Sequence, residues 1–254
     1  MTPTSCIRPD WPAPHRIVAF STTRGGGSSG GRFAGLNLGD HVGDDRARVT
    51  DNRTEFANRL PSGTAVQWLT QDHGTKVILS GDPPQLPLIA DGAWTRASGV
   101  ACTVMTADCL PVLFCARDGG VIGAAHAGWR GLCAGILEAC IEKMGVPAES
   151  LLAWMGPAIG PTAFEVGAEV MQQFLDHDPN ANRASVLECF KPIPGLPDRF
   201  LADLYGLATL RMRSAGIVDI YGGDLCTYGD AQRFYSFRRD GQTGRMATTI
   251  VIRP

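Results

Sequence analysis

Hydrophobic residues along the chain gather into short runs and into stripes with helical spacing. Two apolar runs, at 110–116 and 121–127, flank the turn-forming residues 117–120 and predict an antiparallel β-hairpin. Pairing about this turn sets position 109 opposite a position in the high 120s. Cys109 and His126 are therefore expected at the same end of one hairpin.

Other apolar runs predict strands, and periodic apolar positions predict helices. The predicted strands span residues 17–22, 65–70, 76–80, 91–95, 101–106, 151–155, 218–221 and 245–252. The predicted helices span residues 45–60, 129–144, 167–177 and 201–215, with Pro-rich loops at 81–90 and between the last two helices. Strands and helices mix without a regular βαβ rhythm, which favours an α+β fold over a doubly wound sheet.

Composition narrows the possible partners. The chain has 254 residues, 44% of them hydrophobic, and a net charge of −2 from 23 basic and 25 acidic residues. The sequence contains no basic stripe or acidic tail, so nothing in it indicates binding to nucleic acid or to an anionic membrane surface. No stretch resembles a signal peptide or a membrane span, so we expect a cytoplasmic protein. Eight cysteines without a CxxC pair do not indicate a disulfide scaffold or a four-cysteine zinc site.

The expected proximity of Cys109 and His126 allows two kinds of chemistry. A thiolate and an imidazole can act as a nucleophile and its base, or they can be two ligands of a metal site. The simplest alternative is a small buried cysteine and a histidine that only ends a strand. The flanking Asp108, together with Gly128 and Gly131, favours a functional site because glycine lets a backbone approach a ligand closely.

Two further segments are candidates for binding. The glycine-dense segment TRGGGSSGG at 23–31 could cradle phosphate or ribose with its backbone N–H groups, although a flexible turn explains it equally well. The segment QDHG at 71–74 places His73 at a strand end, where Gly74 permits a tight turn.

Several motifs taken together resemble a known family. They are FSTTRGGGSSGG with LNLGDHVGDD, TQDHG, TADCLPVLF, AAHAGWRG, GPAIGP with FEVG, and CTY with FYSFRRDG and GRMA. In this order they resemble the YfiH-like, or laccase-domain, family, over about residues 17–252. That family carries the labels polyphenol oxidase, purine nucleoside phosphorylase and peptidoglycan editing factor.

The resemblance implies a single α+β domain over residues 1–254, with mixed sheets, helices packed on the sheets and a zinc site. The zinc ligands it implies are His73, Cys109 and His126, all present here. Three protein ligands with one open position are typical of catalytic zinc, and the same set could hold copper. The implied activities are phosphorolysis of adenosine, inosine and 5′-methylthioadenosine, and deamination of adenosine, so the expected partners are a purine nucleoside and phosphate.

Other residues complete this hypothesis. Arg24, with the glycines after it, and Arg130 are predicted to bind phosphate. Asn37 is predicted to contact ribose or base. Asp108 is predicted to act as an acid or base, or to support the metal ligands. The predicted catalytic residues are therefore Cys109, Asp108 and His126.

Three alternatives remain open. In the first, Cys109 is the nucleophile and His126 the base of a hydrolase that cleaves an amide such as a muropeptide precursor. In the second, the chain is a copper-dependent polyphenol oxidase, although its five histidines cannot supply both a blue-copper site and a three-copper cluster. In the third, it is a binding module without activity, which the complete set of two histidines and a cysteine disfavours.

Overall fold

Two β-sheets packed face to face form the centre of the structure, which is a computed structural model describing residues 6–81, 88–177 and 183–254. In order across the first sheet, the strands are β1 (Cys6–Ile7), β2 (Ile17–Thr22), β16 (Met246–Ile252), β8 (Val100–Thr106) and β3 (Ala65–Gln67). The second sheet comprises β15 (Asp219–Gly222), β11 (Leu151–Met155), β9 (Leu110–Ala116), β10 (Ile122–Ala127), β7 (Gly92–Thr95) and β5 (Val77–Leu79).

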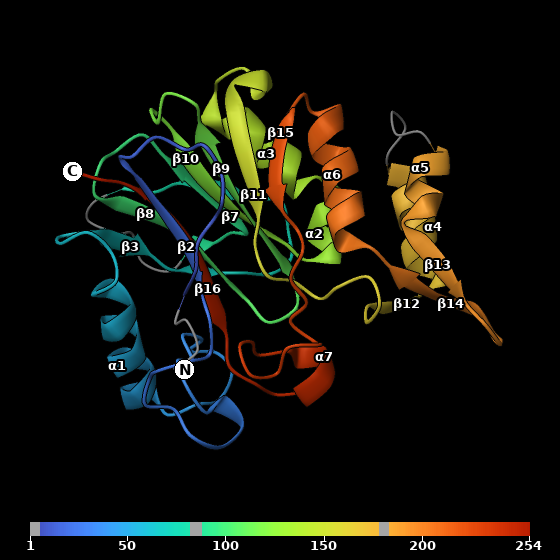
Figure 1. Cartoon of the computed structure of the whole chain (residues 1–254), viewed down its shortest axis with the longest axis horizontal. Helices are drawn as coiled ribbons and strands as arrows, with labels where there is room; N and C mark the ends of the chain where they lie inside the picture. Colours follow the sequence, from blue (N-terminus) through green and yellow to red (C-terminus); the bar gives the residue numbers. More distant parts are fainter. Residues whose placement is uncertain (1–5, 82–87, 178–182) are drawn as a thin grey trace.

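Helices cover the outer face of each sheet (Figure 1). On the first sheet, α1 (Arg46–Ala57) packs Phe56 against Phe20 and Trp68, with ring centroids 5.8 and 5.4 Å apart. Alternate residues of β16 serve the two faces, since Ile250 packs between the sheets and Val251 packs under α1. The second sheet is covered by α2 (Trp129–Ala134), α3 (Ile136–Met144) and α6 (Leu204–Ser214).

A smaller group of elements lies to one side of this layered core (Figure 1). It consists of α4 (Ala168–His177), α5 (Arg183–Glu188) and the three-stranded sheet of β12 (Glu165–Gly167), β14 (Leu196–Ala202) and β13 (Phe190–Ile193). The remaining elements are the paired strands β4 (Leu69–Thr70) and β6 (Leu88–Ile89), the helix α7 (Phe237–Asp240) and short 3₁₀ turns at Gly31–Phe33 and Ala148–Ser150.

The expected α+β class and the central hairpin are confirmed. Strands β9 and β10 pair antiparallel, with Ala127 opposite Leu110 and His126 opposite Pro111. Asp45 caps the start of α1 by accepting hydrogen bonds from two backbone N–H groups. Cys133 and Cys140 are buried in the core cluster that packs on the second sheet.

Several predicted segments differ in detail from the structure. The helix expected over 129–144 is two helices, because Gly135 between them adopts a left-handed conformation with φ of 102°. The strand expected over 65–70 is broken into β3 and β4, and α1 ends at Ala57, before residue 60. The polar segment before α6 holds α5 and the hairpin β13–β14, and the first residues assigned to that helix belong to β14. Residues 82–87 of the predicted loop lie outside the described residues, and 88–89 form β6.

Within the described ranges, none of the helices combines the length and apolar character needed to cross a lipid bilayer.

Gly135 provides a test of the broken helix. In Gly135→Ala we expect the free energy of unfolding to fall by about 1–2 kcal/mol, because a side chain in the left-handed region clashes with its own backbone. Denaturant unfolding measures this change. Gly81→Ala is the control, since Gly81 has open space around it and no positive φ, and an equal loss there would contradict the interpretation.

Candidate metal centre

The ends of four neighbouring strands meet at one edge of the second sheet. Because β9 and β7 both run antiparallel to β10 and β5 runs parallel to β7, the starts of β9, β7 and β5 lie beside the end of β10. Cys109 precedes β9, His126 is near the end of β10, and Asp91 precedes β7. The loop before β5 carries His73. Sheet topology therefore gathers residues that are far apart in the sequence.

His73, Cys109 and His126 form a compact cluster. Each offers one ligating atom, and these three atoms lie within 4.8 Å of one another. His73 Nε2 lies 3.6 Å from Cys109 Sγ, and the two imidazole rings meet edge to face with centroids 4.8 Å apart. Two imidazole nitrogens and one thiolate suit zinc or copper, so the chemistry of the donors fits a bound metal ion.

A buried carboxylate orients one of these histidines. Asp91 is fully buried, and its Oδ1 lies 2.7 Å from His126 Nδ1. Burial alone would raise the pKa of Asp91, but the hydrogen bonds with His126, Asp72 and Gly74 and the charge of His126 together outweigh burial and lower that pKa to about 2. An ionised Asp91 holds one proton of His126 on Nδ1, so Nε2 is the nitrogen that can bind a metal once it has lost its own proton. Inspection of the sequence missed Asp91, which reads as the start of a strand.

Asp91 also holds the loop that carries His73. Its carboxylate accepts hydrogen bonds from the backbone N–H groups of His73 and Gly74, at 3.0 and 2.7 Å. His73 has a φ of 65°, a conformation that few residues other than glycine adopt. These bonds stabilise it.

The glycines around Trp129 make room for this loop. A Cβ atom on Gly128 would lie 2.6 Å from His73 Cδ2, and one on Gly131 would lie 2.9 Å from the Gly74 carbonyl oxygen. The expectation that these glycines let a ligand approach is therefore corrected, because it is the His73 loop that comes close.

The cluster also activates the thiol. Burial alone would raise the pKa of Cys109, but positive charge on His126 and hydrogen bonds from both imidazoles lower it to about 6. A thiolate at neutral pH is the form that binds metals and attacks electrophiles.

A cavity of about 420 Å³ opens above the cluster. Its walls combine aromatic rings with cationic groups, and they include Trp129, Phe164, Phe237, Arg130, Arg238 and Arg245. This volume and this mixture suit a small anionic or aromatic ligand.

Asp108 lines the cavity, but its carboxylate is occupied. It accepts hydrogen bonds from Thr227 Oγ1 at 2.6 Å, from Ser236 Oγ at 3.0 Å and from the backbone N–H of Arg238 at 2.7 Å. Asp108 thus connects the C-terminal loop, which contains residues 227–238, to the turn that carries Cys109. These three donors satisfy both carboxylate oxygens, which gives Asp108 a structural role, while the acid or base role expected for it stays a prediction.

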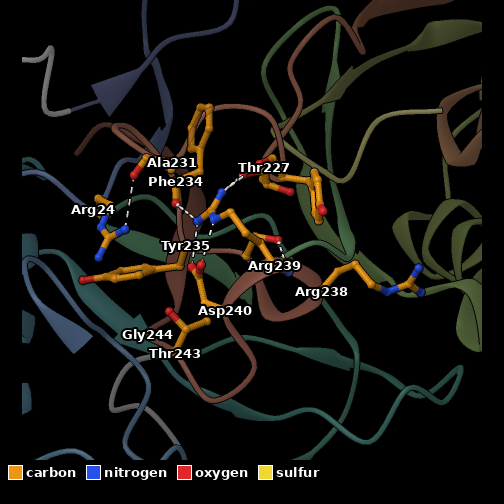
Figure 2. A network of polar contacts seen from close by, with 12 residues as sticks. Arg24, Thr227, Ala231, Phe234, Tyr235, Arg238, Arg239, Asp240, Thr243 and Gly244 are labelled. Carbon is orange, nitrogen blue, oxygen red and sulfur yellow. Dashed lines mark hydrogen bonds and ion pairs between the residues drawn. The ribbon is translucent and has the colours of Figure 1, made fainter. Parts of the chain in front are cut away.

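Arg24 lies outside the cavity lining, in a separate network of polar contacts (Figure 2). Its guanidinium donates to the carbonyl oxygens of Ala231 and Ala34 and stacks over the Tyr235 ring at 4.7 Å. The glycine-dense loop after it packs on α1, where Glu55 and Asn52 accept hydrogen bonds from its backbone. The N–H groups of Gly27 and Ser28 are therefore used within the protein, and the phosphate site expected at this loop stays a prediction.

Asn37 is the residue expected to contact ribose or base. It is fully buried and makes four hydrogen bonds, two donated by Nδ2 and two accepted by Oδ1. An amide with every donor and acceptor in use has none left for a ribose or base.

Arg130 does lie at the cavity. Its exposed guanidinium stacks over the Trp129 ring at 4.4 Å, and within the described ranges it forms no hydrogen bond or ion pair. Of the residues predicted to bind substrate, Arg130 alone is free to do so.

Comparison with known proteins agrees with these features. A family model described as multi-copper polyphenol oxidoreductase laccase matches residues 18–253. The chain belongs to this laccase-domain, or YfiH-like, family. Another laccase-domain protein, named purine nucleoside phosphorylase PA4543, from Pseudomonas aeruginosa, is 49% identical over 96% of this chain and 97% of its own length. The protein named purine nucleoside phosphorylase YfiH, from Escherichia coli, is 46% identical over 96% and 97%.

Solved structures of the family have the same fold. The Neisseria meningitidis protein NMB0706 superposes with a TM-score of 0.92 at 43% identity, over 99% of this chain and 100% of that one. YlmD from Geobacillus stearothermophilus superposes with a TM-score of 0.89 at 31% identity, over 100% and 98%.

Asp91 offers a test of the metal centre in this laccase-domain protein. In Asp91→Asn we expect metal affinity to fall by about 10- to 100-fold, because His126 loses the carboxylate that orients it. Competition with a chromophoric chelator measures the affinity. Asp10→Asn, at an exposed position far from the centre in sequence, is the control. Equal affinities in wild type and Asp91→Asn would contradict the role given to Asp91.

Proposed function

We propose that this chain is a zinc-dependent purine nucleoside phosphorylase that acts on adenosine, inosine and 5′-methylthioadenosine and also deaminates adenosine. The observation that carries the proposal is the cluster of His73, Cys109 and His126 beside a cavity with aromatic and cationic walls. The names of the relatives from Pseudomonas aeruginosa and Escherichia coli support the same activity.

The cluster would hold the metal, with Asp91 keeping His126 in the ligating tautomer. A zinc ion with three protein ligands supplies Lewis-acid polarisation at its open coordination position. This chemistry explains why one site could serve both phosphorolysis and deamination.

Phosphorolysis needs a purine and a phosphate side by side. A phosphate oxygen bonds to ribose C1′ while the C1′–N9 bond breaks, and the purine leaves with the electron pair and gains a proton. The rings of Phe237 and Trp129 offer stacking surfaces for the base. Arg130, unpaired at the cavity, would attract the phosphate.

We also propose that residues 1–254 act as one domain. The cavity draws on residues from His41 to Arg245 and therefore on both sheets and the C-terminal loop. A fragment of the chain would lack part of its lining.

One specific observation favours a second function. The lowered pKa of Cys109 beside His126 also suits a cysteine hydrolase that cleaves amides. The two functions differ in their metal requirement, because a nucleophilic thiolate must be free and a ligating one is not. By contrast, the several coppers named in the description of the family model would lack ligands here, since His15, His41 and His177 do not belong to the ligand cluster.

Cys109→Ala separates zinc phosphorylase from cysteine hydrolase. We expect zinc content to fall well below about one ion per chain and nucleoside phosphorolysis to fall with it, because the remaining imidazoles form a weak site. Elemental analysis and product assays on the same sample measure both. Cys6→Ala removes a thiol next to Arg59 and should change neither quantity. Zinc and turnover both retained in Cys109→Ala would refute the ligand assignment, whereas zinc retained with turnover lost would favour the hydrolase.

Metal exchange tests the oxidase label. We expect the zinc form to turn over adenosine with phosphate and to leave phenols unchanged. Slow phenol oxidation should arise only after copper loading, because copper binds nitrogen and sulfur ligands more tightly than zinc. Parallel assays of the zinc and copper forms measure this difference. Fast phenol oxidation by the zinc form without nucleoside turnover would reverse the proposal.

A further inference from the structure

The guanidinium of Arg245 lies in the wall of the cavity without a carboxylate partner among the residues that the structure describes. Arg245, in the loop before β16, is half-buried and lines the cavity together with Cys109 and Asp108. Its Nη1 donates to the carbonyl oxygens of Thr243 and Gly244, the two residues labelled below Asp240 in Figure 2. Burial lowers the pKa of Arg245, so the group has lost part of its hydration.

Neutral oxygens are its only hydrogen-bond acceptors in the described part of the chain. Within that part, no carboxylate lies within ion-pair distance of Arg245. The acidic group nearest to it along the cavity wall, Asp108, is occupied by three other donors. A partly buried charge without an opposite charge is costly, and guanidinium has five N–H donors in a planar fork. Its Nε and Nη2 donors are therefore available to an anion.

The neighbouring segment fixes Arg245 in this position. Asn37 Oδ1 accepts the backbone N–H of Arg245 at 2.8 Å, and the Arg245 carbonyl accepts the backbone N–H of Leu38 at 3.1 Å. A Cβ atom on Gly39 would lie 2.8 Å from Arg245 Cγ, so glycine makes room for the side chain. The same segment brings His41 to the cavity, where burial and the charge of Arg245 lower the pKa of His41.

We propose that Arg245, with His41 beside it, forms the oxyanion subsite that binds inorganic phosphate for the reaction. This inference rests on the proposed phosphorolysis and names the group that holds its second substrate. The planar fork of arginine matches two oxygens of a phosphate, and the missing negative charge would come from the ligand. An anion there lies next to the metal ligands, since Arg245 and Cys109 share the cavity wall.

Arg130 differs from Arg245 in the ways that matter for this role. Its guanidinium is exposed and rests on Trp129, whereas Arg245 is half-buried. A charge in water gains less from an anion than one that has been partly desolvated. Arg130 would therefore attract phosphate and Arg245 would hold it.

The test compares the zinc-loaded forms of wild type, Arg245→Gln, Arg245→Lys, Arg130→Gln and the distant control Arg253→Gln. One readout is the rise in Tm caused by inorganic phosphate at constant ionic strength, which does not require turnover. The other is the pair of KM values for phosphate and for nucleoside. Zinc content and Tm without phosphate check that each variant is folded.

In Arg245→Gln we expect the phosphate-induced rise in Tm to disappear and the KM for phosphate to rise at least about tenfold, or about 1.4 kcal/mol. The KM for nucleoside should rise less than the KM for phosphate, because the base would stack on the rings of Trp129 and Phe237, whereas the guanidinium, 6.0 Å from the Phe237 centroid, would bind the phosphate. Arg245→Lys should be intermediate, since it keeps the charge but loses the fork. Arg130→Gln should have a smaller effect, and Arg253→Gln none.

A phosphate-induced rise in Tm that survives in Arg245→Gln, or one that is lost in Arg130→Gln instead, would overturn the proposal. A wild type that gains Tm from phosphate through Arg245 but cleaves no nucleoside would support the subsite and refute the phosphorylase. Should Arg245→Gln fail to fold, His41→Gln at an exposed position decides the matter. In that variant we expect the KM for phosphate to rise at least about twofold, because one weak hydrogen bond to the phosphate is lost. An unchanged KM for phosphate would count against the subsite.

Discussion

The buried carboxylate of Asp91 is the interaction on which the candidate site depends. It bonds the His126 ring and the backbone of His73 and Gly74, so it links two of the three potential metal ligands. These residues are far apart in the sequence, and only the pairing of β9, β10, β7 and β5 brings them to one edge. Without Asp91, the sheet would still form, but the imidazoles would lack a defined orientation.

The site carries features that are unfavourable by themselves. His73 has a positive φ, an activated thiolate lies beside an imidazole, and Arg245 is partly desolvated without a carboxylate. The hydrogen bonds from Asp91 stabilise the first, a metal bound to the cluster would neutralise the thiolate, and a bound anion would neutralise the guanidinium. Such unfavourable features in a chain with an otherwise ordinary core are typical of a binding site.

Features that depend on residues close together in the sequence could be predicted, and features that depend on distant residues could not. The hairpin that aligns Cys109 with His126 depends on a local turn, and its register was predicted correctly. The break at Gly135 was missed, because an apolar stripe with helical spacing runs through both α2 and α3. Asp91 was missed because its partners lie 18 and 35 residues away and leave no local pattern.

The surroundings of the residues expected to bind substrate could not be predicted from the sequence either. A run of glycines after Arg24 resembles a phosphate loop, but whether its N–H groups are free depends on α1, which uses them. Asn37 accepts a hydrogen bond from the backbone N–H of Arg245, and this contact between distant residues leaves no pattern in the sequence.

The central claim is that His73, Cys109 and His126 bind one zinc ion together, and X-ray absorption at the zinc edge of the zinc-loaded protein tests it most directly. The account predicts one sulfur at about 2.3 Å and two imidazole nitrogens at about 2.0–2.1 Å, with one further light ligand in the open position. In Cys109→Ser the sulfur contribution should vanish. A first shell without sulfur in the wild type, or with more than one sulfur, would contradict the account.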